Sequence, residues 1–177
     1  MTPRRKPKKL NAEELWDYAL KSLGRRAQSS AELRRKLASR AENSAAITAV
    51  MAKLREYGMA DDRQFSEAFA AARLDHQGLG KLRVIRDLRT KQIPENVARS
   101  AAEKAYKDTN EADLIDAFLR RKYRGKNLPE HFKDRKNLAS AYRRLRVAGF
   151  SSGAALAGLK RYVDMPEEIS EPEEPTD

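Results

Sequence analysis

Residues 30–37 read SAELRRKL, a short basic segment with leucines at positions 33 and 37. Similar text returns twice, as GKLRVIRDL at 80–88 and LASAYRRL at 138–145, each time with two apolar residues four positions apart. Arginines precede the three segments at positions 26, 73 and 120, at intervals of 47 residues. A repeat of this length predicts stacked copies of one small helical unit, none of which can bury its apolar face alone.

The sequence around these segments also has the periodicity of helices. Apolar residues recur at spacings of three and four, and no run alternates in the manner of a strand. We therefore predict an all-α fold of three tandem three-helix repeats, similar to helix-turn-helix bundles, that form an elongated curved array. The predicted repeats cover residues 11–60, 61–108 and 109–163, with a loop around Gly125 to Pro129 in the third.

The two ends of the chain carry opposite charges. Residues 1–9 hold five of the 37 basic residues and residues 164–177 hold seven of the 26 acidic ones, which leaves 32 basic and 19 acidic residues between them. We predict a disordered basic arm over residues 1–10 and a disordered acidic tail over residues 164–177. The cationic centre favours a polyanionic partner, nucleic acid or an assembly that contains it, although a basic surface that serves only solubility remains an alternative.

Several classes of function have no support in the sequence. Cysteine is absent, which excludes disulfides, thiolate zinc sites and cysteine nucleophiles. His76 and His131 are isolated, and Gly78 and Gly80 lack the strand and third glycine of a dinucleotide-binding turn, so we predict no catalytic residue, metal or cofactor. No segment has the length of a signal-peptide core or a membrane span, and no long heptad seam is visible, so we expect a cytoplasmic monomer that binds no membrane.

Basic residues on the second helix of each repeat are the predicted partner-binding residues. In the middle repeat, positions 83, 86 and 90 share one helix face while 84, 85 and 88 point inward, so the arginines form an exposed stripe. A solvated face without a partner is the alternative. The stripe contains Arg34, Arg35 and Lys36, then Lys81, Arg83, Arg86 and Arg89, then Arg143, Arg144 and Arg146. Arg120, Arg121, Lys122 and Arg124 extend it, and Tyr123 either stacks on a ligand or packs.

Two further features have a structural and a functional interpretation. Asp61 and Asp62 form a pair of adjacent carboxylates, which more often caps a helix than binds a metal or transfers a proton. Trp16 is expected to cover the edge of the first repeat, with a partner contact as the alternative.

Three motifs follow one another along the chain. They are Arg26-x-x-Ser29-x-x-Glu32-Leu33, then Tyr57-Gly58-Met59-Ala60-Asp61-Asp62-x-x-Phe65, then Gly80 with Val84 and Leu88. In this order they resemble the RecX family, regulators of the bacterial recombinase RecA, over roughly residues 12–163. Gln92 stands where that family usually has a glycine.

The resemblance implies a non-enzymatic regulator that binds the groove of the RecA filament on single-stranded DNA. Such a protein inhibits ATP hydrolysis, strand exchange and co-protease activity, and so modulates DNA repair, recombination and the SOS response. The alternatives are a direct DNA-binding protein of helix-turn-helix type, for single- or double-stranded DNA, and a scaffold for acidic proteins. Direct DNA binding predicts a steep dependence on salt and no need for RecA.

Overall fold

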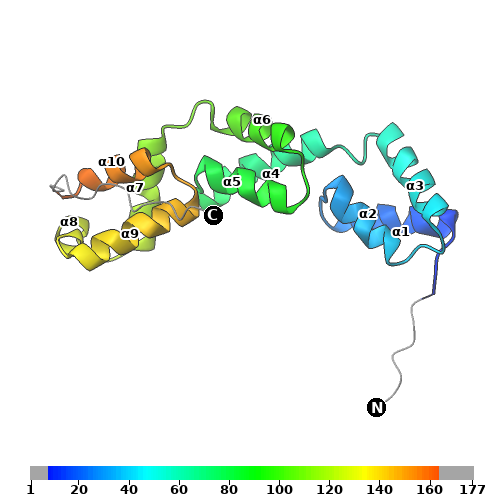
Figure 1. Ribbon diagram of the computed structural model, residues 1–177, viewed down its shortest axis with the longest axis horizontal. Coiled ribbons are helices and arrows are strands. Elements are labelled where there is room, and N and C mark those ends of the chain that lie inside the picture. The colour runs from blue at the N-terminus through cyan, green and yellow to red at the C-terminus, as the bar shows by residue number, and fades with distance from the viewer. Residues whose placement is uncertain (1–7, 164–177) are drawn as a thin grey trace, which may run out of the picture. The chain divides into compact units, whose positions relative to one another are not determined.

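Ten α-helices form the regular structure of residues 8–163, which are the residues that the computed structural model describes (Figure 1). Within this range the only β-structure is an isolated parallel bridge between Leu10 and Ala41, so the predicted all-α fold is confirmed. In chain order the helices are α1 (Ala12–Arg25), α2 (Ser30–Ala38), α3 (Ser44–Glu56), α4 (Asp62–Gln77), α5 (Lys81–Thr90), α6 (Glu95–Tyr106), α7 (Glu111–Lys122), α8 (Leu128–Phe132), α9 (Arg135–Ala148) and α10 (Ser152–Lys160).

The helices belong to two compact units. Unit 1 contains the residues up to Phe69 together with Leu88–Ala101, and unit 2 contains Ala70–Asp87 together with the residues from Ala102 onward. The middle predicted repeat, with α4, α5 and α6, therefore contributes residues to both units. The repeat boundaries at 11–60, 61–108 and 109–163 and their curved arrangement stay predictions.

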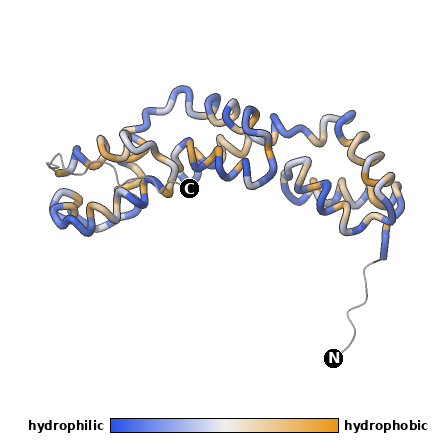
Figure 2. The backbone as a smooth tube through the Cα atoms, viewed as in Figure 1, coloured by the Kyte–Doolittle hydropathy of each residue, from blue (hydrophilic) through white to orange (hydrophobic). Residues whose placement is uncertain are grey.

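Unit 1 is built around α1, α2 and α3. Their buried apolar residues recur mostly three or four positions apart, and hydrophobic and hydrophilic residues alternate along the tube (Figure 2). Leu15, Leu33, Leu37 and Leu54 are fully or almost fully buried in this core. Side-chain caps fix where α1 and α2 begin, because Asn11 and Ser29 each form a capping box with a glutamate three residues later.

Leu10 is ordered, although the sequence placed it in the disordered arm. Its amide donates to the Arg40 carbonyl oxygen (2.8 Å), and its carbonyl oxygen accepts from the Glu42 amide (2.9 Å). The Leu10 side chain packs against the core of unit 1, so this core includes a residue that precedes α1. Residues 1–7 of the predicted arm, and the whole predicted acidic tail, lie outside the described residues.

Unit 2 is built around α7, α9 and α10, with α8 packed against α9. The short helix α8 starts at Leu128, within the segment that the sequence predicted to be a loop. Asn127 caps it, and Leu128 and Phe132 are buried in the core of unit 2. The sequence analysis missed this helix because a single turn is too short to show a helical period.

Within unit 2, the start of α5 meets the end of α9. The Gly80 amide donates to the Ala148 carbonyl oxygen (2.8 Å), and the Leu82 amide donates to the Gly149 carbonyl oxygen (3.1 Å). Amides at a helix start and carbonyls at a helix end have no partner within their own helix. The junction therefore satisfies both helix ends at once.

Gln92 occupies a left-handed backbone conformation just after α5, with φ of 60°. The Ile93 amide donates to the Leu88 carbonyl oxygen (3.2 Å), and the Gln92 amide donates to the Arg89 carbonyl oxygen (2.9 Å), the two bonds of a Schellman motif. Glycine is the usual residue at such a position because it has no Cβ. This explains physically why a glycine would suit position 92 better than glutamine.

We expect Gln92→Gly to raise the free energy of unfolding by about 0.5–1 kcal/mol. The substitution removes a left-handed penalty of roughly 1–2 kcal/mol and adds part of it back as chain entropy in the unfolded state. Chemical denaturation measures the change. Ser100→Gly, at an exposed helical position in α6, is the matched control and should instead lower stability by about 0.5 kcal/mol. A loss of stability in Gln92→Gly would contradict the argument.

Candidate nucleic-acid interface

The predicted basic stripe is divided between the two units. Arg34, Arg35, Lys36 and Arg89 belong to unit 1, and the remaining predicted residues belong to unit 2. We describe each group within its own unit.

In unit 1, Arg34 and Arg35 are the available cations of the stripe. Both are exposed on α2 and have no ion pair or hydrogen-bond partner for their side chains among residues 8–163. Lys36 is half-buried and donates to the Ser22 hydroxyl (2.7 Å), while Arg89 forms an ion pair with Glu95. Lys36 and Arg89 therefore already have partners within the protein.

On the unit 2 part of α5, most predicted cations are paired. Arg83 Nε lies 2.8 Å from the Asp87 carboxylate, and its guanidinium also donates to the Val147 carbonyl oxygen (3.3 Å). Lys81 forms a longer ion pair with Glu103, at 3.8 Å. Arg86 is exposed and has no such partner in the described part of the chain, so it is the available cation of this helix.

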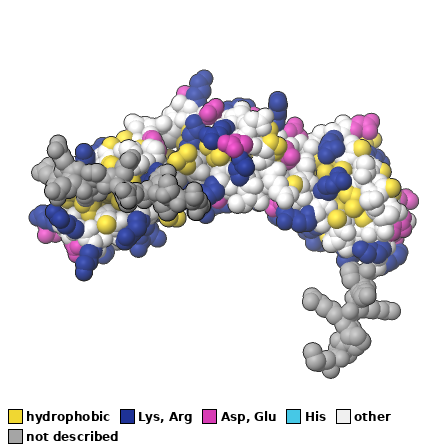
Figure 3. Space-filling model, viewed as in Figure 1, with side chains coloured by type: hydrophobic (Ala, Val, Ile, Leu, Met, Phe, Trp, Pro, Cys, Tyr) yellow, Lys and Arg dark blue, Asp and Glu magenta, His cyan; other side chains and the backbone are white. Residues whose placement is uncertain are grey.

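Helix α9 presents two exposed arginines of the stripe, Arg143 and Arg144. The Arg144 guanidinium lies over the Tyr123 ring, 5.8 Å from its centroid. Arg146 is half-buried and donates to the Phe150 carbonyl oxygen (3.1 Å), which fixes the turn after the helix. Figure 3 shows lysine and arginine side chains gathered over the part of unit 2 formed by α8 and α9.

The second predicted basic group surrounds an open pocket of about 440 Å³ at the end of α7. Residues 120–126 contain five cations and no acidic residue. Arg120 binds Asp116 (2.6 Å) and Arg121 donates to the Gln77 carbonyl oxygen, whereas Lys122 and Arg124 are exposed without such partners among the described residues. The pocket is lined by Arg120, Tyr123, Arg124, Gly125, Lys126, Leu128, Pro129 and Tyr162.

Lys126 and Tyr162 are polar lining residues that the sequence analysis did not single out. The continuation of the basic run across Gly125 was a usable signal for Lys126. Tyr162 follows α10 and reaches this pocket only through the fold of unit 2, so its position in the sequence carried no signal.

Asp116 orders one wall of this pocket. Its carboxylate accepts hydrogen bonds from Arg120 and from the Tyr162 hydroxyl. The hydrogen bond from Arg120, followed by the one from Tyr162, holds the pKa of Asp116 below its usual value. Asp116 is therefore anionic at neutral pH and fixes the positions of both side chains.

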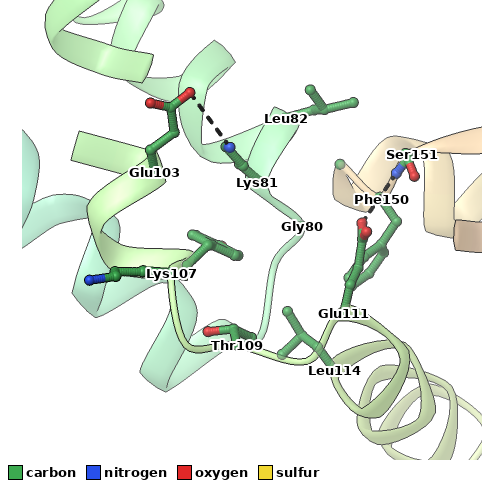
Figure 4. Close-up of a pocket in the computed structure, with 12 residues that line it drawn as sticks. Gly80, Lys81, Leu82, Glu103, Lys107, Thr109, Glu111, Leu114, Phe150 and Ser151 are labelled. Carbon is green, nitrogen blue, oxygen red and sulfur yellow. Dashed lines mark hydrogen bonds and ion pairs between the residues drawn. The ribbon is translucent and has the colours of Figure 1, made fainter. Parts of the chain in front are cut away.

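A second pocket in unit 2, of about 320 Å³, lies beside the start of α5 (Figure 4). Lys81 and Glu103 pair on one side, and Glu111 reaches the Ser151 amide on the other (Figure 4). Tyr106 donates to the Leu79 carbonyl oxygen, and burial raises the pKa of Tyr106 to about 12, so its hydroxyl is a neutral donor. This pocket is lined by both acidic and basic side chains, so it has no preference for a polyanion.

The first RecX-like motif forms a junction within unit 1. The Ser29 hydroxyl, fully buried, donates to the Lys91 carbonyl oxygen (2.9 Å), and the Glu32 carboxylate pairs with the Lys91 ammonium (3.0 Å). Asp62 accepts a hydrogen bond from the Ser30 amide (2.7 Å). These motif residues therefore hold the start of α2 in place.

The interpretation of the Asp61–Asp62 pair as a helix cap is confirmed, but the two carboxylates bind amides at the starts of different helices. Asp61 accepts from the Arg63 and Gln64 amides (2.8 and 3.1 Å) and so caps α4. Asp62 instead bonds the first amide of α2, as the sequence alone did not indicate.

Trp16 packs against the core of unit 1 as a partly buried side chain. The Lys53 ammonium lies 4.3 Å from the centroid of its ring. This position agrees with the interpretation that Trp16 covers the edge of the first repeat.

We expect Glu32→Gln to lower stability at pH 7 by about 1–2 kcal/mol and to have a smaller effect as the pH falls through the folded pKa of Glu32. Partial burial raises the pKa of Glu32, but hydrogen bonds from Lys91 and the Ser29 amide outweigh it and hold this pKa below its usual value. Because the pKa of Glu32 is lower in the folded than in the unfolded protein, the ionised carboxylate stabilises the fold. This stabilisation is fully present above the unfolded pKa, about 4.3, and is lost as the pH falls through the folded pKa.

Urea denaturation at several pH values tests this prediction. Glu56→Gln, at an exposed glutamate that ends α3, removes one carboxylate with no ion pair among residues 8–163 and is the control. Equal effects of the two variants at pH 7 would contradict a role for the Glu32–Lys91 pair.

Among residues 8–163, no helix is long and apolar enough to cross a membrane, and no three His, Cys, Asp or Glu side chains cluster as metal ligands. His131 instead packs beside Tyr123 and Phe132, with ring centroids 5.2 and 5.5 Å away.

These features define an all-helical protein with clusters of exposed cations. Two family models match the chain: RecX, first three-helix domain, over residues 16–54, and RecX, second three-helix domain, over residues 61–101. The regulatory protein RecX of Thermus thermophilus is 34% identical over 139 residues, which cover 78% of this chain and 85% of that protein. The chain belongs to the RecX family of regulatory proteins.

Other relatives and structures agree. The regulatory protein RecX of Deinococcus radiodurans is 28% identical over 172 residues, 96% of this chain and 79% of that protein. The match to the RecX of Mycobacteroides abscessus spans 57% of this chain and only 50% of that protein. The crystal structure of RecX from Lactobacillus salivarius has a TM-score of 0.64 at 17% identity, covers 85% of this chain and 96% of its own, and supports the fold.

Proposed function

We propose that this protein is a non-enzymatic regulator that binds the RecA filament on single-stranded DNA and inhibits its ATP hydrolysis, strand exchange and co-protease activity. The observation that carries this proposal is membership of a family whose members are named regulatory proteins. Exposed and unpaired arginines support it, because a filament that contains DNA is a polyanion. The contact residues are drawn from the predicted stripe. Its best candidates are Arg34, Arg35, Arg86 and Arg143, because their side chains are exposed and have no ion pair or hydrogen-bond partner among residues 8–163.

We expect the protein to inhibit the single-strand-dependent ATPase of RecA at a ratio well below one molecule per RecA. The titration uses DNA in excess, so that sequestration of DNA contributes nothing. Arg34→Glu with Arg35→Glu should weaken inhibition at least tenfold, because each reversal replaces an attraction to a polyanion by a repulsion. Inhibition only at ratios that saturate the DNA would contradict the proposal.

A matched control separates this effect from net charge. Lys21→Glu with Arg55→Glu makes the same charge change at exposed positions of α1 and α3 in the same unit. This control should inhibit the ATPase as the unchanged protein does. Equal losses in both double variants would indicate long-range electrostatics without a defined contact.

Direct DNA binding is the second candidate function, and one observation favours it. The run of five cations at residues 120–126 has no acidic residue within it and borders an open pocket. If direct DNA binding is the only activity, the affinity for DNA should fall steeply with salt and should not depend on RecA.

A further inference from the structure

We infer that the pocket at the end of α7 binds one nucleotide of single-stranded DNA through its phosphodiester group. This inference rests on the proposed function, because it names a nucleic-acid contact that a regulator of a DNA-bound filament would make. We call the pocket, as lined by Arg120, Tyr123, Arg124, Gly125, Lys126, Leu128, Pro129 and Tyr162, the α7–α8 pocket.

The backbone brings two unpaired cations to this pocket. The Lys126 amide donates to the Tyr123 carbonyl oxygen (3.0 Å), which closes a four-residue turn with Gly125 in its third position. Gly125 has φ of 81°, a conformation that favours glycine. As a result Arg124 and Lys126, on either side of the glycine, line the same pocket, and both are exposed with no side-chain partner among the described residues.

A purely structural role does not account for these cations. Basic residues in the last turn of a helix interact favourably with its dipole, which explains Arg120, Arg121 and Lys122. This effect decays within the last turn, and α7 ends at Lys122, so it does not explain Arg124 and Lys126.

Acidic side chains near the pocket are already engaged. Asp116 is bound by Arg120 and Tyr162, and Glu130 of α8 pairs with Lys133 (2.6 Å). The pocket therefore offers a net positive charge to an anionic ligand. A phosphodiester has one negative charge and oxygen acceptors that match guanidinium and ammonium donors.

Apolar and aromatic surfaces in the pocket suit the rest of a nucleotide. Tyr123 and Tyr162 both pack edge-on against the buried Phe132 ring, at centroid distances of 5.3 and 6.0 Å, so their positions are fixed before a ligand arrives. The volume of about 440 Å³ lies in the range of small-ligand sites. A single strand presents unstacked bases and sugars to such a surface, whereas the bases of a duplex stay stacked inside it.

The test measures fluorescence anisotropy of a labelled oligothymidine with the full chain, without RecA, over a range of salt concentrations. Arg124→Gln with Lys126→Gln should weaken binding at least tenfold and reduce the slope of log affinity against log salt by about 0.7, because the contact to one phosphate is lost. Lys21→Gln with Arg55→Gln, the same charge change at exposed positions of unit 1 outside the predicted binding residues, should leave the affinity within about twofold of the unchanged protein. Thermal unfolding of each variant confirms that it folds.

Three outcomes would overturn the inference. An equal loss of DNA affinity in the two double variants would mean that binding follows the net charge of the protein. An unchanged salt slope in the pocket variant would mean that the pocket contacts no phosphate. A duplex of the same length that competes as well as the single strand would remove the preference for an unstacked nucleotide.

The RecA ATPase assay separates this inference from the proposed function. If the pocket variant binds oligothymidine normally while the unchanged protein inhibits RecA, the pocket inference fails and the proposed function stands. If the pocket variant loses DNA binding while the unchanged protein does not inhibit RecA, the proposed function fails and the pocket stands as a direct DNA site.

Discussion

Replacing Gly149 with alanine is expected to lower the free energy of unfolding of unit 2 by about 3 kcal/mol or more. Gly149 has φ of 94°, which costs an alanine roughly 1–2 kcal/mol. Its added Cβ would also lie 2.2 Å from the Arg83 amide nitrogen and 2.4 Å from the Arg83 Cβ. Overpacking of this kind costs about 1–3 kcal/mol, and here the obstacle includes backbone of the α5–α9 junction, which moves only if the junction opens.

Other glycines of unit 2 are matched controls for the two causes. Gly125 has φ of 81° but nothing within 4 Å of an added Cβ, so Gly125→Ala should cost only the conformational part, about 1–2 kcal/mol. Gly153 lies within α10 in open space, and Gly153→Ala should stabilise by about 0.5–1 kcal/mol. Chemical denaturation measures all three, and equal effects of Gly149→Ala and Gly125→Ala would disprove the close approach of α5 and α9.

Phe132→Ala is expected to destabilise unit 2 by about 3–5 kcal/mol, the usual cost of removing a buried phenylalanine ring. Phe132 is 1% exposed and contacts the Tyr123 and Tyr162 rings. Its loss leaves a cavity under both tyrosines, so the α7–α8 pocket should lose its ordered wall together with the stability.

Val147→Ala tests whether burial is the cause. Val147 lies on α9 in the same unit and is 61% exposed, so its truncation should change stability by no more than about 0.5 kcal/mol. Denaturant titration followed by circular dichroism compares the two variants. A small effect of Phe132→Ala would contradict the packing of α8 into the core of unit 2.

Local signals in the sequence predicted much of the fold. The spacing of Leu33 and Leu37 predicted the apolar pair of α2, and the burial of both residues is confirmed. These features depend on residues three and four apart, which a helix brings together whatever the rest of the chain does. The departure at Gln92 was visible only through the resemblance to a family that usually has a glycine there, and the left-handed conformation after α5 gives its physical reason.

Contacts between distant residues were beyond such reasoning. Ser29 meets Lys91 across 62 positions, and nothing in either local sequence indicates the other. The available cations of the candidate site were equally hard to predict, because contacts between distant residues decide which basic side chains stay free to bind a partner. The pairing of Arg83 with Asp87 follows from their spacing of four, yet the additional bond from Arg83 to the Val147 backbone depends on the α5–α9 junction.

That junction also makes the start of α5 depend on a segment more than sixty residues further along the chain. In unit 2 the first amides of α5 are completed by backbone carbonyls from the end of α9, whereas α9 begins with an aspartate of its own, Asp134, that accepts from the Lys136 amide (2.7 Å). A chain without α9 would therefore leave the Gly80 and Leu82 amides without these partners, whereas the cap of α9 comes from its own sequence.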